Sequence, residues 1–158
     1  MIPPNWKLRY KESYEKWQLV AYQAASRDFG TLPVKYPDVT THNGLINFML
    51  NFLKWNNHRA TRINNTGRII SSVTKGEAGG YFKDVKRITS STRNGTADVS
   101  ATILGRAVML DAKVGNDKPS QAQLGEQQLE RNSGGVYEFI SHPDQFLEWY
   151  DQFILSLK

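Results

Sequence analysis

Cysteine is absent from this chain of 158 residues, which excludes disulfides and thiolate metal sites. No apolar run reaches the length that spans a membrane, and Met1–Trp6 lacks the apolar core of a signal peptide. The three histidines, His42, His58 and His142, show no metal-ligand spacing, and we assign them no role. We therefore expect a cytoplasmic protein with no membrane partner.

Several catalytic signatures are also missing. The chain has no Gly-x-Ser-x-Gly elbow and no Cys/His pair for nucleophilic catalysis. The glycine-rich stretch Thr74–Tyr81 is not followed by lysine and serine, and no helix opens after it. A phosphate-binding loop needs both features, so we expect an ordinary loop there.

Positive charge is present and unevenly placed. The net charge is +5, and residues 59–93 contain eight basic residues against two acidic ones. The excess of six in this window exceeds the balance of the whole chain. A basic run is usually a solvated face, but one that precedes a carboxylate cluster favours phosphate contacts and hence a nucleic-acid partner. The candidate phosphate-contacting residues are Arg59, Arg62, Arg68, Lys86, Arg87 and Arg93.

Hydrophobic periodicity and turn residues predict a mixture of helices and short strands in a single domain of α/β or α+β type. Helices are expected over 6–29, from the cap at Thr40 or Thr41 to about 57, from Ser120 to 134, and from about 142 onward. Strands are expected over 60–63, 68–73, 83–91, 96–103, 107–114 and 136–140. The turn residues 64–67 lie between the first two strands. Residues 1–40 are interpreted as an N-terminal helical extension and 41–158 as the main domain.

The chain is organised around a predicted hairpin that carries three charged side chains. Residues alternate between apolar and polar in both strands, and Gly105-Arg106 fits a type II′ turn. If Leu104 pairs with Ala107, Asp98 lies opposite Lys113. Asp98 and Asp111 are then diagonal neighbours on one face, about 7–8 Å apart at the backbone.

Two carboxylates and a lysine on neighbouring strands are the groups that metal-assisted phosphodiester hydrolysis requires. Mg²⁺ prefers oxygen ligands such as Asp98 and Asp111, and a lysine such as Lys113 can orient water or neutralise developing charge. The simpler interpretation is a surface hairpin with a cross-strand ion pair, worth under about 1 kcal/mol. Spacing alone favours the simpler interpretation.

The order of elements and motifs resembles the PD-(D/E)XK nuclease superfamily, and within it the VRR-NUC type and Holliday-junction-resolvase-like phage nucleases. The residues that carry the resemblance are Gly95-Thr96-Ala97-Asp98, Asp111-Ala112-Lys113 and the Ser120-x-x-Gln123 helix start, within about residues 41–150. The resemblance implies a restriction-endonuclease-like α/β core, a mixed sheet flanked by helices. It also implies a Mg²⁺- or Mn²⁺-dependent DNA endonuclease in a bacterial or phage-infected cell.

The same resemblance assigns roles to individual residues. Asp98 and Asp111 would hold the metal, Lys113 would assist the attacking water, and Gln123 would support the site as a fourth catalytic residue. A homodimer follows only by analogy with resolvase-like relatives.

Three positions depart from the family pattern. Ala97 replaces a proline, Asp111 replaces the more usual glutamate, and the first core helix offers Asn43 or Asn47 where a glutamate is expected. An amide oxygen brings no charge to a cation, so we expect weaker metal affinity. The alternatives to a nuclease are a nuclease-fold DNA-binding module without catalysis and, least favoured, an interaction domain with no nucleic-acid role.

Overall fold

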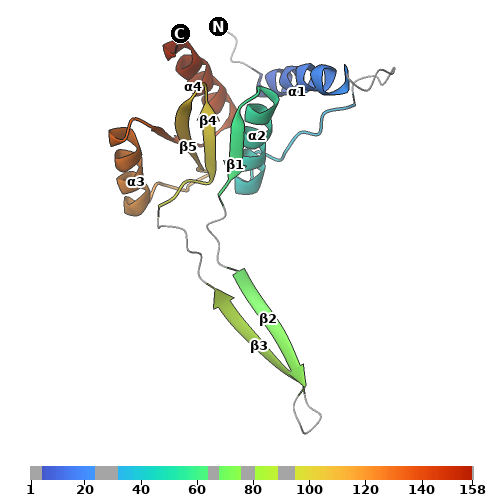
Figure 1. Cartoon of the computed structure of the whole chain (residues 1–158), viewed down its shortest axis with the longest axis vertical. Coiled ribbons are helices and arrows are strands. Elements are labelled where there is room, and N and C mark those ends of the chain that lie inside the picture. Colours follow the sequence, from blue (N-terminus) through green and yellow to red (C-terminus); the bar gives the residue numbers. More distant parts are fainter. Residues whose placement is uncertain (1–4, 24–31, 64–67, 76–80, 89–94, 158) are drawn as a thin grey trace.

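The computed structural model describes residues 5–23, 32–63, 68–75, 81–88 and 95–157, which form an α/β protein (Figure 1). The predicted mixed sheet with flanking helices is confirmed. The elements in chain order are α1 (Trp6–Gln23), α2 (His42–Trp55), β1 (Arg59–Arg62), β2 (Arg68–Lys75), β3 (Tyr81–Ile88), β4 (Val99–Ile103), β5 (Arg106–Ala112), α3 (Gln121–Asn132), β6 (Val136–Ile140) and α4 (Pro143–Ser156).

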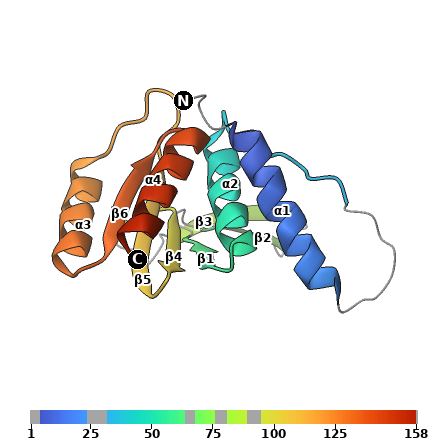
Figure 2. The ribbon, with the colours of Figure 1, turned by 90° about the horizontal axis from the view of Figure 1, so that it is seen from above.

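The main sheet has four strands in the order β1-β4-β5-β6. β4 pairs antiparallel with β1 and with β5, whereas β5 and β6 run parallel and are connected through α3. Helices α2 and α4 pack on one face of the sheet, and α3 lies beside β6 on the other. Viewed from above, α3 and α1 lie at opposite sides of the molecule with α4 and α2 between them (Figure 2).

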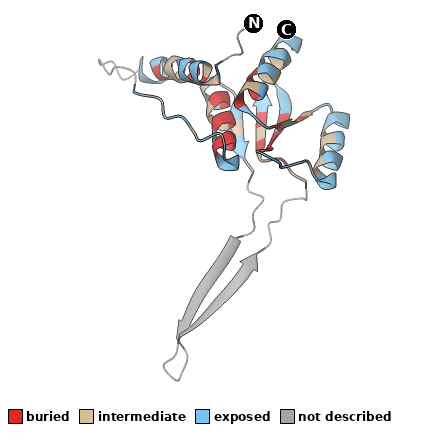
Figure 3. Cartoon of the chain, turned by 180° about the vertical axis from the view of Figure 1, so that it is seen from behind, coloured by how far each residue is buried: buried red, intermediate tan, exposed pale blue. Residues whose placement is uncertain are grey.

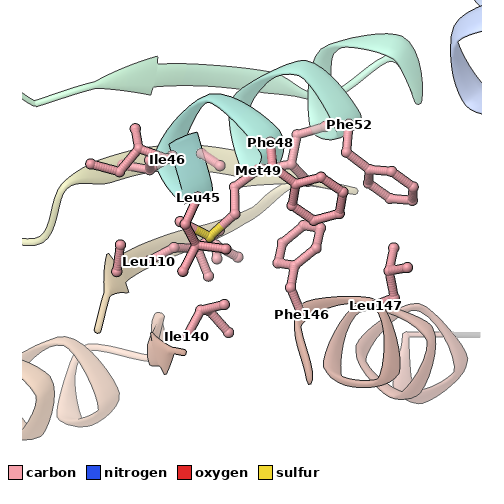
Figure 4. Close-up of a cluster of buried hydrophobic side chains, with 14 of the residues drawn as sticks. Leu45, Ile46, Phe48, Met49, Phe52, Leu110, Ile140, Phe146 and Leu147 are labelled. Carbon is pink, nitrogen blue, oxygen red and sulfur yellow. The ribbon is translucent and has the colours of Figure 1, made fainter. Parts of the chain in front are cut away.

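The apolar core lies between the sheet and helices α2 and α4. Alternate residues of β4 and β5 point into it, as period-two patterning predicts, and Phe146 of α4 packs edge-on against Phe48 and Phe52 of α2 (Figure 4). Burial is concentrated on the inner face of α2 and on the central strands (Figure 3). This apolar layer holds the sheet against helices α2 and α4.

Helix α1 covers the outer side of α2 through aromatic contacts. Tyr10 is fully buried, stacks on Phe48 and accepts a hydrogen bond from Asn51 Nδ2 (3.0 Å). The helix expected over 6–29 is described as far as Gln23, and residues 24–31 lie outside the described part of the chain. Because Tyr10 belongs to the core cluster, α1 contributes to the same core as the sheet.

The start of α2 is fixed by its cap and by the segment before it. Thr41 is the N-cap, as predicted, and its hydroxyl accepts from the Gly44 amide. A β-carbon at Gly44 would lie 1.7 Å from the Asp38 carbonyl oxygen, so only glycine fits there. The close approach sets where α2 begins and therefore where its first side chains lie.

The β4–β5 turn differs from the prediction. Leu104 and Gly105 both have positive φ, 46° and 82°, so they are the central pair of a type I′ turn and not a type II′ turn at Gly105-Arg106. Ile103 pairs with Arg106 and Val99 with Leu110, a register shifted by two residues from the expected one. Since side chains alternate with a period of two, a shift of two leaves every residue on its predicted face.

The first hairpin also differs. The predicted strands around residues 64–67 do not pair with each other. Instead β1 pairs with β4 of the main sheet, and β2 pairs with β3 in a separate two-stranded ribbon, the β2–β3 ribbon, that projects from the core (Figure 1). Across the described residues, no helix is both long and apolar enough to span a bilayer.

Candidate active site at one end of the sheet

Four elements bring polar residues to one end of the sheet. β1 and β5 run antiparallel to β4, so the last residues of β1 and β5 meet the residue before β4. Helix α2 begins at the same end, because its first residue contacts Asp98. This end therefore collects side chains that are far apart in the sequence.

Asp111 and Lys113 form a buried ion pair there. They are two residues apart at the end of β5, so both lie on the face opposite the core, and Lys113 Nζ is 2.6 Å from Asp111 Oδ2. Asp111 is 2% exposed and Lys113 is 8% exposed. Burial of an unpaired charge costs roughly several kcal/mol. Because Asp111 and Lys113 pair with each other, each reduces the cost of burying the other.

The protonation of this pair follows from burial and contact. Burial raises the pKa of the Asp111 carboxyl, the hydrogen bond from Lys113 opposes that rise, and the negative charge of Asp98 adds to it. Burial acts to lower the pKa of Lys113, but its hydrogen bond and attraction to Asp111, with a smaller contribution from Asp117, outweigh burial and raise it. Lys113 therefore remains a cation beside a carboxylate that is harder to ionise than usual.

Gln123 of α3 holds Asp111 from the other side. Its Nε2 donates to both carboxylate oxygens of Asp111, at 3.0 and 3.2 Å. The predicted capping box is present: the Ser120 hydroxyl accepts from the Gln123 amide, and Gln123 Oε1 accepts from the Ser120 amide. One side chain thus closes the helix start and orients the buried acid.

Asp98 lies just before β4, in contact with the end of β5. The amide of Ala112, which lies between Asp111 and Lys113 in the chain, donates to Asp98 Oδ2 at 2.9 Å. The Asp98 carbonyl accepts from the Ile63 amide at 2.7 Å, which continues the β1–β4 pairing by one residue. Asp98, Asp111, Lys113 and Gln123, all predicted from the sequence, therefore lie together.

His42 was missed by the sequence reasoning. Its Nε2 is 3.1 Å from Asp98 Oδ2, and it is the first residue of α2. The available signal was its place directly after the cap Thr41, on the helix turn where the family pattern expects an acid. Asn43 beside it accepts from Arg62 Nη2 at 2.6 Å, whereas Asn47 is exposed.

The candidate phosphate-contacting residues are spread over two regions. Arg62 lies at the end of β1 beside the site, and Arg59 is exposed at the other end of that strand. Arg68, Lys86 and Arg87 belong to the β2–β3 ribbon. Arg93 lies outside the described residues.

Tyr137 of β6 lies beside the site. Its hydroxyl donates to the Gly95 carbonyl at 3.1 Å. Burial raises the pKa of Tyr137 and the charges of Asp111, Asp98 and Glu126 raise it further, so the phenol stays neutral. Gly95 has φ +87°, and a β-carbon there would lie 2.4 Å from the Ala122 carbonyl oxygen, so the motif glycine lets the segment before β4 approach α3.

Only some of the side chains at the site are of the kind that bind a hard cation. Within the part of the chain that the structure describes, no three His, Asp or Glu side chains are grouped to hold a metal ion. The two carboxylates, Asp98 and Asp111, are nevertheless the oxygen donors that Mg²⁺ and Mn²⁺ accept, with water and substrate oxygens completing the shell. A cation bound there would have two protein ligands, Asp98 and Asp111.

Comparison with known proteins adds no family assignment. No protein-family model matches the chain, and no curated protein matches its sequence.

Proposed function

We propose that this protein is a divalent-metal-dependent DNA endonuclease that hydrolyses phosphodiester bonds. The observation that carries the proposal is the buried Asp111–Lys113 pair, held by Gln123 and adjacent to Asp98. A structural ion pair is usually exposed and needs no second acid, whereas this one lies under a helix with Asp98 beside it. Clusters of perturbed titratable groups are typical of functional sites.

Each residue has a chemical role in this proposal. Asp98 and Asp111 would hold Mg²⁺ or Mn²⁺, which when bound supplies positive charge to the phosphate and lowers the pKa of a water molecule. Lys113, kept protonated by Asp111, offers an N–H donor to a phosphate oxygen or to the attacking water. Gln123 keeps the Asp111 carboxylate in one orientation, and His42 does the same for Asp98.

DNA is the proposed substrate because of the charge around the site. The excess of six positive charges in residues 59–93 immediately precedes Asp98 in the chain. Arg62 lies beside the site, and the other candidate contacts are Arg59, Arg68, Lys86, Arg87 and Arg93. Phosphate contacts of this kind provide affinity that falls steeply with salt.

The test is cleavage of DNA by single-residue variants. Asp111→Ala and Lys113→Ala are each expected to reduce Mg²⁺-dependent cleavage by at least about 10²-fold, the scale measured when one transition-state donor is removed. Lys118→Ala, an exposed lysine on the loop after β5, is the matched control and should retain activity. Cleavage that persists in either site variant would place the chemistry elsewhere.

The second candidate is a nuclease-fold module that binds DNA without cutting it. It is favoured by one observation: α2 contributes His42 to the site and no carboxylate. Calorimetric titration of Mn²⁺ into the wild type and Asp98→Asn separates the two functions. A nuclease should take up metal stoichiometrically and lose that uptake in the variant, whereas a binding module should show none.

A further inference from the structure

The β2–β3 ribbon is a long hairpin whose two strands, among the described strands of the chain, pair only with each other. Its register runs through eight cross-strand pairs, from Arg68↔Ile88 to Lys75↔Tyr81. Figure 1 shows it projecting from the core, with none of the described helices covering either face. An isolated two-stranded hairpin is marginally stable in water, so contact with a partner would stabilise the ribbon.

The sequence read on this register gives the ribbon a strong positive charge. Its strands contain five basic residues and one acidic residue, Asp84, a net charge of +4. The positions of Lys75, Lys83 and Arg87 share one face, which has no acidic position. Those of Arg68 and Lys86 share the other face with Asp84.

The positive charge of the ribbon favours an anionic partner. Two ribbons of net charge +4 would repel each other, so a second copy of the chain is disfavoured, whereas a polyanion is attracted. The major groove of duplex DNA accepts a two-stranded ribbon. Single-stranded DNA has no such groove. Eight residues at about 3.4 Å each span roughly 27 Å, which is about eight base pairs along a duplex.

The ribbon leaves the core at the end that carries the candidate site. Ile63, the last described residue before β2, donates its amide to the Asp98 carbonyl at 2.7 Å. Gly95, the first described residue after β3, accepts from Tyr137. Both sides of the ribbon's base therefore adjoin the residues proposed to cut DNA.

We propose that the β2–β3 ribbon is a duplex-binding arm that enters the major groove beside the cleaved bond, with the face of Lys75, Lys83 and Arg87 toward the phosphates. The inference rests on the proposed function and defines its substrate class. The substrate is double-stranded for about eight base pairs or more next to the site of cleavage, the length that the ribbon can contact.

The experiment measures DNA binding in EDTA, where no cleavage occurs. A labelled duplex of about 25 base pairs and a single strand of the same length are titrated between about 50 and 200 mM salt, with anisotropy as the readout. The test variant is Lys75→Gln/Lys83→Gln/Arg87→Gln. The control variant is Lys11→Gln/Lys16→Gln/Lys54→Gln on α1 and the end of α2, which removes the same number of positive charges.

The expected result is a preference for duplex in the wild type and a loss of that preference in the test variant. Its slope of log affinity against log salt should fall by about three, since each lost phosphate contact removes about 0.9. The α1–α2 control, which loses as many positive charges as the test variant, should keep the slope. The single change Lys83→Gln, which disturbs the ribbon least, should remove about one unit of slope.

Several outcomes overturn the proposal. A test variant that keeps the wild-type slope, or loses no more than the α1–α2 control, shows that the ribbon does not contact DNA. Equal affinity for single strand and duplex excludes groove binding, and dimers that dissociate in the test variant would identify a second copy as the partner. Duplex binding through the ribbon without metal-dependent cleavage would instead refute the nuclease function and still support the ribbon as a duplex-binding arm.

Discussion

The two faces of the main sheet differ in the kind of side chain that they bury. The face toward α2 and α4 carries fully buried apolar side chains such as Val99, Val108 and Leu110, closed by Phe52 and Phe146. The face toward α3 carries Asp111 and Lys113, nearly as buried but charged, and α3 itself has no buried residue. The same strands supply both faces by alternation.

The difference separates the face that provides stability from the face that carries the proposed chemistry. Apolar burial contributes favourably in proportion to area, so the α2–α4 face stabilises the sheet. A buried ion pair contributes little net stability compared with apolar residues of similar volume. Its presence on the α3 face is therefore better explained by the proposed chemistry than by a need for stability.

The largest expected effect comes from breaking the apolar face. Phe52→Ala removes a side chain that contacts Phe48, Phe146 and Tyr150. It should lower the free energy of unfolding by about 3–5 kcal/mol, because the cavity adds to the lost burial. Urea denaturation measures the change, and Leu155→Ala at a 68% exposed position should stay within about 0.5 kcal/mol of wild type. A similar loss in both variants would contradict the contrast between the faces.

The next effect comes from unpairing the charged face. Lys113→Met leaves Asp111 buried without its cation and should cost about 3 kcal/mol of unfolding free energy at neutral pH. The double variant Lys113→Met/Asp111→Leu removes both charges and should recover most of that loss while remaining inactive. The same urea denaturation applies, and a double variant less stable than the single one would show that the pair serves stability.

The smallest effect concerns pH and a histidine on the apolar side. His58 Nε2 lies 2.7 Å from the Tyr150 hydroxyl, and burial lowers the pKa of His58. The unfolded chain therefore binds the proton more tightly, and stability falls as pH drops through the usual histidine range, from about 6.5 downward. His58→Gln should flatten the melting temperature between about pH 7.5 and 5.5, and an unchanged pH profile would exclude this contribution.

Local signals in the sequence predicted most elements. The capping box at Ser120 and Gln123 and the cap at Thr41 were confirmed because their partners lie within one helical turn. The β4–β5 turn was predicted wrongly because it places Leu104 at positive φ, which a leucine does not signal. The partner of β1 was missed because β4 lies beyond an intervening ribbon, and sequence patterns do not report such distant pairing.

The site shows the same division. The alternation of the two hairpin strands, a local pattern, predicted that Asp98, Asp111 and Lys113 share a face. Gln123 was added to them by the resemblance, because its place in the capping box had already explained it. The contact of His42 with Asp98 depends on where α2 docks against the sheet, which is set by the core and by Gly44. A search for histidines spaced relative to one another could not reveal a histidine whose partner is an aspartate of another element.

The hydrogen bond between Ile63 and Asp98 means that the chain leaves the sheet and returns to it at one point. The entropy of closing such an excursion rises only with the logarithm of its length, about 0.6 kcal/mol for each doubling. The segment between these two residues can therefore be lengthened or shortened at little cost while the main sheet keeps its architecture. The length of the ribbon and the integrity of the fold are in this way set independently.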